Sequence, residues 1–313
     1  MTKTSPAEDT AEPAGFYPIR TVSSLTGVNS VTLRAWERRY NLIRPQRTAK
    51  GHRLYTQEDV DRIQRVVALL NQGISIGQVK PLVDEAVPAP ARLVQTGQTD
   101  EWQRYRTRML NAIERFDEAA VDAAYNDALS LYPVELVIRN LATPLLQHLG
   151  KHWKERRAGV AEEHFFSVYL RNKIGARIHH LNARGTGPQL LISCLPGEYH
   201  EVGMLFFALA AVSHGYRVVV FGANLPLEQI PVVLEQRRCD AVVLSGSARP
   251  ARGLIDEQLP ALIENVDIPV FVGGSISARH GDAIDATGAI SIGQDFQSAL
   301  TRIGEQLGSG KRR

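Results

Sequence analysis

From residue 189 onward, short apolar runs alternate with longer helical stretches, five times over. The runs lie at 190–195, 217–221, 241–244, 269–272 and 289–292, and the helical stretches at 201–214, 227–236, 251–264, 278–285 and 296–307. Five such β/α units predict a doubly wound, Rossmann-like parallel sheet of five strands over 185–308. Because these sheets bind ligands beyond the carboxyl ends of their strands, we expect the functional residues in the loops that follow the runs.

The first run leads into a polar loop with His200 at its centre, in the sequence LLISCLPGEYHEVG. His200 is one of nine histidines, so a chance position in a loop is the plain alternative. The other strand ends carry small residues, including Ser245-Gly246-Ser247 and Gly273-Gly274. Small residues clear bulk from the sheet edge and leave room for a flat or extended ligand. The first turn lacks a GxGxxG pattern, which disfavours a dinucleotide.

The stretch 100–184 is helical in pattern throughout, with breaks near residues 116, 132 and 158. Four helices joined by short connections predict an antiparallel four-helix bundle. Pro144 lies inside a helical pattern and predicts a kink. Trp153 ends the third piece, and Glu163-His164 opens the fourth. Taken alone, these residues are explained by packing and by the preference for an acid in the first helical turn.

Positive charge is concentrated in the segment 16–84. Phe16 to Val83 holds eleven Lys/Arg against four Asp/Glu, although the formal net charge of the whole chain is only +3. Gly27 separates two short helices, and Asn29 or Ser30 caps the second, which predicts a helix-turn-helix. A basic hairpin, or wing, is expected over 44–55 with its turn near Lys50-Gly51. The excess charge favours a nucleic-acid partner over a basic helical bundle without one.

The second helix and the wing supply the expected DNA contacts, to base edges and to phosphates. These residues are Thr32, Arg34, Arg38, Arg39, Arg47, Lys50, His52, Arg53 and Tyr55. The polar segment 1–15 predicts a disordered tail, and 85–99, which contains Pro88 and Pro90, predicts a linker.

Composition narrows the location of the protein. The two cysteines, Cys194 and Cys239, lie in or beside apolar runs, which favours buried thiols over a disulfide scaffold or a zinc site. The N-terminus lacks the apolar core of a signal peptide, and no apolar run reaches the length of a membrane helix. We therefore expect a cytoplasmic protein that does not contact a membrane.

The N-terminal segment closely resembles the winged helix-turn-helix of MerR-family regulators. The resemblance is carried by Thr32-Leu33-Arg34-Ala35-Trp36-Glu37-Arg38-Arg39-Tyr40 and by Gly51-His52-Arg53-Leu54-Tyr55. It implies binding to double-stranded operator DNA as a dimer. The segment 85–99 lacks the sustained heptads of a coiled coil, so we expect self-association through the C-terminal part.

The C-terminal sheet is similar to cobalamin-binding domains. The signature is Glu198-x-His200-x-x-Gly203, followed by Ser245-Gly246-Ser247 and Gly273-Gly274. The resemblance implies that one ring nitrogen of His200 is the lower axial ligand of cobalt. It also implies that Glu198 accepts a hydrogen bond from the other ring nitrogen of His200. By the same resemblance, Gly203 is expected to lie close to the corrin ring and Ser245 to contact the displaced nucleotide base, while Gly273-Gly274 leaves space for that base. Glu201 and Ser247 lie within the same motifs and are expected to contact the cofactor as well.

The whole chain after residue 15 resembles the CarH/LitR-type photoreceptor repressors. In that family a Trp ten residues before a Glu-His pair covers the upper face of the corrin, which implies this role for Trp153, Glu163 and His164. The resemblance implies a repressor, not an enzyme, that binds adenosylcobalamin and DNA as a tetramer in the dark. The resemblance also implies that light breaks the cobalt–carbon bond and that the tetramer then dissociates.

Lys154 departs from the family pattern, which has a histidine directly after the Trp as the upper cobalt ligand after light. His152, His164 or water would take that position here. Two rival functions are a MerR-type regulator that is independent of cobalamin or controlled by a partner, and a cobalamin-dependent methyltransferase subunit. The basic N-terminal segment and the lack of a substrate barrel argue against the methyltransferase subunit.

Overall fold

The computed structural model describes residues 15–84, 91–183 and 185–310. The chain forms two compact units, Met1–Glu162 and Glu163–Arg313, which are treated separately below. The expected disordered tail lies outside the described residues, apart from Gly15. None of the helices within the described ranges combines the length and the apolar character needed to span a membrane.

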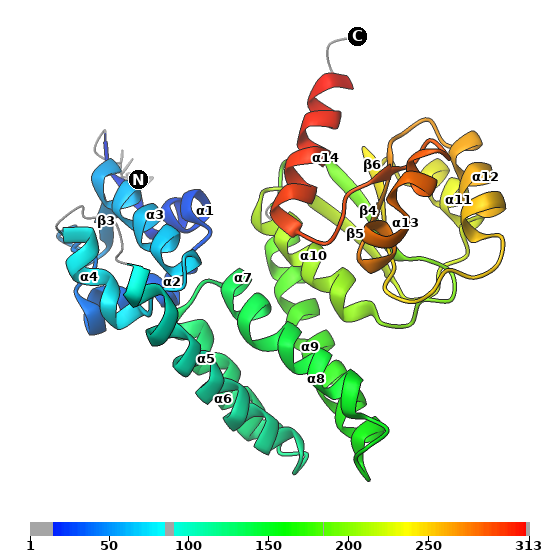
Figure 1. Ribbon diagram of the computed structural model, residues 1–313. Helices are drawn as coiled ribbons and strands as arrows, with labels where there is room; N and C mark the ends of the chain where they lie inside the picture. The colour runs from blue at the N-terminus through cyan, green and yellow to red at the C-terminus, as the bar shows by residue number, and fades with distance from the viewer. Residues whose placement is uncertain (1–14, 85–90, 184, 311–313) are drawn as a thin grey trace, which may run out of the picture. The chain divides into compact units, whose positions relative to one another are not determined.

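The first unit begins with the expected winged helix-turn-helix (Figure 1). Its elements are β1 (Tyr17–Pro18), α1 (Ile19–Thr26), α2 (Ser30–Ala35), η1 (Trp36–Tyr40), β2 (Gln46–Arg47), β3 (Arg53–Tyr55), α3 (Gln57–Asn71) and α4 (Ile76–Asp84). Gly27 ends α1 in the left-handed conformation, and the Asn29 side chain caps α2 by accepting from the amides of Val31 and Thr32. The strands form an antiparallel sheet in the order β1-β3-β2, and Gly51, with φ of 81°, makes the turn of the wing.

A helical region completes the first unit. Its elements are α5 (Ala91–Ile113), α6 (Glu118–Leu131), α7 (Val134–Val137), η2 (Ile138–Ala142) and α8 (Thr143–His152). Helix α5 packs beside α6, and it begins at Ala91, within the stretch predicted as a linker. The last three elements run on as one helix, and the wide π-helical turn η2 ends two residues before Pro144, where a kink is expected. A fourth long helix, α9 (Gly159–Asn182), starts in this unit and continues into the second.

The second unit contains the expected parallel sheet. Its strands are β4 (Gln189–Cys194), β5 (Arg217–Gly222), β6 (Ala241–Ser245), β7 (Val270–Gly273) and β8 (Ile290–Ser291). They lie in the order β5-β4-β6-β7-β8, all parallel. In this order the chain reverses direction across the sheet between β4 and β6, which makes their carboxyl ends the expected ligand site.

Helices cover both faces of this sheet (Figure 1). They are α10 (Glu201–Ser213), α11 (Gln229–Gln236), η3 (Leu254–Gln258), α12 (Leu259–Glu264), α13 (Ser275–Asp285) and α14 (Phe296–Gly310). Alternate residues of the strands, such as Leu191 and Val242, pack with α11, α12 and α13 in one apolar core. On the other face α10 lies against β4 and β5 and contacts α14. Cys194 is buried and Cys239 half-buried, and both are free thiols, as predicted.

Candidate functional site

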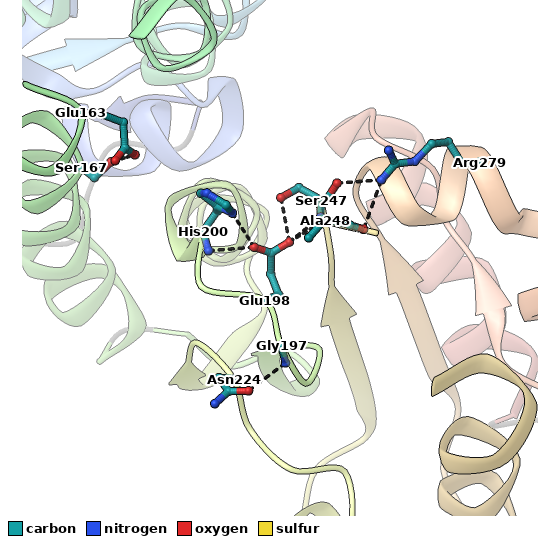
Figure 2. Close-up of polar contacts among 9 residues, drawn as sticks. All are labelled: Glu163, Ser167, Gly197, Glu198, His200, Asn224, Ser247, Ala248 and Arg279. Atoms are coloured by element: carbon teal, nitrogen blue, oxygen red, sulfur yellow. Dashed lines mark hydrogen bonds and ion pairs between the residues drawn. The ribbon is translucent and has the colours of Figure 1, made fainter. Parts of the chain in front are cut away.

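Two loops leave the sheet at its switch point and meet over Glu198 (Figure 2). One follows β4 and carries Glu198 and His200, and the other follows β6 and carries Ser247. Strands β4 and β6 are parallel neighbours, with Cys194 paired to Ser245, so both loops emerge at the same edge. The structure therefore brings Glu198, His200 and Ser247 together at this edge of the sheet.

Glu198 is the centre of the hydrogen-bond network at this edge and is only 3% exposed. Its Oε1 accepts from the backbone amide of His200 (2.8 Å) and from His200 Nδ1 (2.7 Å). Its Oε2 accepts from the amide and hydroxyl of Ser247 (2.5 and 2.7 Å) and from the amide of Ala248 (2.8 Å). Burial alone would raise the pKa of Glu198, but these donors outweigh it and lower the pKa to about 2. The carboxylate is therefore charged at neutral pH.

His200 precedes α10 as its N-cap residue, and 72% of its side chain is exposed. Because Nδ1 faces a charged carboxylate, it is the ring nitrogen that donates, and in the neutral form of the ring the lone pair lies on Nε2. Within the described residues Nε2 makes no hydrogen bond. An imidazole that a carboxylate orients in this way is a metal ligand of raised basicity in its neutral form, so His200 would suit the cobalt of a cobalamin.

Glycines keep side chains away from the site. A Cβ on Gly274, which has φ of 87°, would lie 2.5 Å from the carbonyl oxygen of Gly246. A Cβ on Gly246 would in turn lie 2.9 Å from Leu195 and 3.0 Å from Ile276. In contrast, a Cβ on Gly203 would meet nothing within 4 Å. The backbones after β6 and β7 are thus packed together, while open space borders the first turn of α10. This arrangement fits a flat ring above His200.

The other residues expected at the cofactor are placed as follows. Ser245 and Gly273 are register partners at the ends of β6 and β7. Glu201, in the first turn of α10, pairs with Arg171 of α9 at 3.4 Å. The Glu163 carboxylate accepts from the Ser167 hydroxyl at 2.9 Å (Figure 2). The exposed ring of His164 lies beside the same carboxylate, with its Nδ1 3.1 Å from Glu163 Oε2.

Trp153 belongs to the first unit, where it caps α8 and is 42% exposed. The Nζ atom of Lys154 lies 5.3 Å from the centre of the Trp153 ring. The ring of His152 lies beside that of His148, and its Nδ1 contacts the His148 carbonyl oxygen at 2.9 Å.

The turn that carries Trp153 is held by residues that the sequence did not single out. A Cβ on Gly159 would lie 2.4 Å from the Trp153 carbonyl oxygen, so only glycine fits this close approach. Arg156 forms ion pairs at 2.8 Å with Glu114, after α5, and with the buried Glu162 of α9. The only signal available in the sequence was the glycine at the expected helix break.

The predicted DNA contacts divide into exposed and buried residues. Arg34, Arg38, Arg39, Arg47, Lys50 and His52 are exposed. Arg47 and Arg53 both pair with Glu37, at 3.0 and 2.5 Å. Burial raises the pKa of Glu37, but its hydrogen bonds to the two arginines outweigh burial and lower it. Tyr55 is buried in the core of the wing and lies away from solvent.

Thr32 is also buried, because one face of α2 and η1 lies against the C-terminal end of α6. The Thr32 hydroxyl donates to the Leu129 carbonyl oxygen at 2.8 Å, and Trp36 Nε1 donates to that of Leu131 at 2.8 Å. The last carbonyls of a helix lack partners within it, so these side chains cap α6. Sequence spacing gave no sign of this contact.

Comparisons with known proteins match this arrangement. Residues 17–86 match the family model of MerR HTH regulatory proteins, and residues 105–178 match that of the B12 binding domain. The fold and these matches define a DNA-binding transcription regulator that carries a B12-binding domain.

Two relatives identify the family more closely. The HTH-type transcriptional repressor CarA of Myxococcus xanthus is 30% identical over 87% of this chain and 91% of that protein. The HTH-type transcriptional repressor CarH of the same organism is 28% identical over 84% of this chain and 90% of that protein. The chain therefore belongs to the CarA/CarH-type family of cobalamin-binding MerR repressors and is a regulator, not an enzyme.

Among solved structures, the monomethylamine corrinoid protein of Methanosarcina barkeri superposes with a TM-score of 0.52 at 17% identity. The match covers 65% of this chain and 98% of that one. At this identity the likeness shows the fold alone, a helical region followed by a parallel sheet.

Proposed function

We propose that the protein is a light-responsive transcriptional repressor that binds operator DNA as an adenosylcobalamin-dependent oligomer, a tetramer, in the dark. The observation that carries the proposal is the way in which the His200 ring is held and oriented. Its Nδ1 is held by the buried carboxylate of Glu198, and its Nε2 is left available for cobalt. Membership of the CarA/CarH-type family supports the DNA-binding half of the proposal.

Different residues of the chain would contact the lower and the upper face of the corrin ring. His200 would hold cobalt from below, with Glu198 fixing its ring, and Ser245, Ser247, Gly273 and Gly274 would border the nucleotide base. Trp153, Glu163 and His164 would cover the upper face, where Trp153 already offers an exposed ring. Adenosylcobalamin, when bound, supplies a cobalt–carbon bond that light can break.

After light, loss of the adenosyl group would remove the partner of the upper-face residues. Lys154 stands where the family has a histidine, so His152, His164 or water would take the vacant position. The oligomer would then be the two-state element that both the ligand and light act on. Because several DNA modules on one oligomer bind together, dissociation alone would release the operator.

The test is size-exclusion chromatography of the protein with adenosylcobalamin, in the dark and after illumination, coupled to operator binding at fixed salt. We expect a larger species that binds DNA in the dark and a smaller one that does not bind after light. His200→Ala is the matched control and should give the small species under both conditions. An elution volume unchanged by light would refute the switch. Tight DNA binding by cobalamin-free protein would favour the cobalamin-independent regulator.

A further inference from the structure

We propose that Arg279 of α13 is a positioning residue for His200. It holds the loop after β6 in the conformation that anchors Glu198, and Glu198 in turn orients the His200 ring. The inference rests on the proposed function, since it concerns how the imidazole is presented to cobalt.

Arg279 reaches back from its helix to the loop that follows β6 (Figure 2). Its Nη2 donates to the carbonyl oxygens of Ser247 (2.7 Å) and Ala248 (3.2 Å). Its Nε donates to the Ser275 carbonyl oxygen of its own helix at 3.2 Å, which fixes the direction of the guanidinium. The side chain therefore joins the first turn of α13 to the loop.

The peptide group between Ser247 and Ala248 is gripped from both sides. It is trans, so its carbonyl oxygen and its N–H point in opposite directions. Arg279 binds the carbonyl oxygen, and Glu198 Oε2 accepts from the Ala248 N–H at 2.8 Å. A positive group at the oxygen end and a negative group at the N–H end polarise the same peptide and strengthen both hydrogen bonds. Arg279 thus supports Glu198 without touching it.

The loop has little else to hold it at this point. Gly246 is fixed by hydrogen bonds with Gly273 and Ile276, but Ser247 and Ala248 are exposed. Throughout the described ranges, these two residues hydrogen-bond only to Glu198 and Arg279. Loss of Arg279 would leave Glu198 as the sole hydrogen-bond partner of Ser247 and Ala248 among the described residues. Three of the five donors to the carboxylate would then move with a mobile segment, and the His200 ring would lose its fixed direction.

The experiment compares Arg279→Ala and Arg279→Lys with Arg302→Ala as the matched control. Arg302 is also an exposed arginine that donates to a main-chain carbonyl oxygen, that of Ser291 at 2.6 Å, but it does not touch the loop. Each protein is produced with ¹⁵N-labelled and unlabelled histidine and loaded with cob(II)alamin. Electron paramagnetic resonance then reports whether the nitrogen splitting of the cobalt signal follows the histidine isotope. Titration with adenosylcobalamin in the dark gives the affinity.

In wild type and Arg302→Ala the splitting should follow the histidine isotope in all bound molecules. Outer-shell partners of metal ligands typically contribute 10–100-fold to affinity, and we expect the low end, about tenfold weaker binding, for Arg279→Ala. A fraction of its cobalt should also lose the histidine signal. Arg279→Lys should fall between the two, because lysine keeps the charge and one donor. In cofactor-free protein, amide hydrogen exchange at Ala248 should quicken in Arg279→Ala, while the unfolding temperature should match that of Arg302→Ala.

Two results would overturn the positioning role. One is an Arg279→Ala variant that matches Arg302→Ala in affinity and isotope response. The other is weaker binding with the histidine signal intact, which would instead assign Arg279 a direct contact with the cofactor. If wild type itself shows no isotope effect, the assignment of His200 in the proposed function fails, and this inference fails with it.

Discussion

Glu198→Gln tests the network at the sheet edge with almost no change in side-chain size. The carboxylate accepts two hydrogen bonds on Oε1 and three on Oε2. A carboxamide keeps one oxygen, but its NH2 group cannot accept. Whichever way it is oriented, either the donors of His200 or those of Ser247 and Ala248 lose their acceptor.

The cost follows from the number of bonds lost. A hydrogen bond to a charged group contributes about 1.5–3 kcal/mol, so the loss of two removes about 3 kcal/mol or more. Part of this is offset because the neutral amide is easier to bury than a carboxylate. We expect the free energy of unfolding of cofactor-free protein to fall by about 2–4 kcal/mol. For a unit of this size the unfolding temperature should fall by about 5–10 °C.

The difference should also depend on pH in a defined direction. The pKa of Glu198 is lowered to about 2 from 4.5, so the charged form favours the folded state. The contribution of the charged Glu198 to the free energy of unfolding is complete above the pKa that the group has in the unfolded chain. This contribution is lost as the pH falls through the folded-state pKa of about 2. In urea denaturation, the difference in the free energy of unfolding between wild type and Glu198→Gln should be constant above pH 5 and should become smaller below it. Glu264→Gln, an exposed carboxyl in the same unit, is the control. If the free energies of unfolding of wild type and Glu198→Gln differed by less than about 0.5 kcal/mol at pH 7, the reasoning would be refuted.

Three further predictions follow from single contacts. Gly274→Ala should lower the free energy of unfolding by about 3 kcal/mol, since its Cβ would lie 2.5 Å from the Gly246 carbonyl oxygen. Gly293 has a φ of 65° but open space around it, so Gly293→Ala should lower the free energy of unfolding by only about 1 kcal/mol. Equal losses in the two variants would show that the clash at Gly274 does not determine the effect. Trp36→Phe leaves the Leu131 carbonyl oxygen without its donor and should reduce stability by about 1–2 kcal/mol in chemical denaturation, and no change would discount that contact. Arg34→Ala should weaken operator binding and reduce its salt dependence in a gel-shift series, while exposed Arg237→Ala should do neither.

Local signals predicted most of the second unit. A glycine, a proline or another small residue lies within two residues after each strand, so the strand ends were placed within one or two residues. The neighbouring carboxyl ends of β4 and β6 brought His200 and Ser247 together. The helix that begins at Ala91 was missed because Pro88 and Pro90 dominate the pattern just before it. Beyond Pro90, residues 91–99 are mostly good helix formers.

Contacts between distant residues could not be predicted in this way. Arg279 occupies an exposed helical position that sequence alone assigns to solvent, and its partners lie more than thirty residues earlier in the chain. Thr32 looked equally free to contact DNA, yet its hydroxyl partner is in α6, 97 residues away. Such pairs depend on tertiary packing that no local period encodes.

The central claim, that His200 holds cobalamin from below, is tested most directly by absorption spectroscopy. Wild type and His200→Ala are titrated with adenosylcobalamin in the dark and then illuminated. The account predicts that wild type binds one equivalent, with the spectral shift of a histidine-ligated cobalt, and changes spectrum on illumination. His200→Ala should bind far more weakly and without that shift. Identical spectra and affinities for the two proteins would contradict the account.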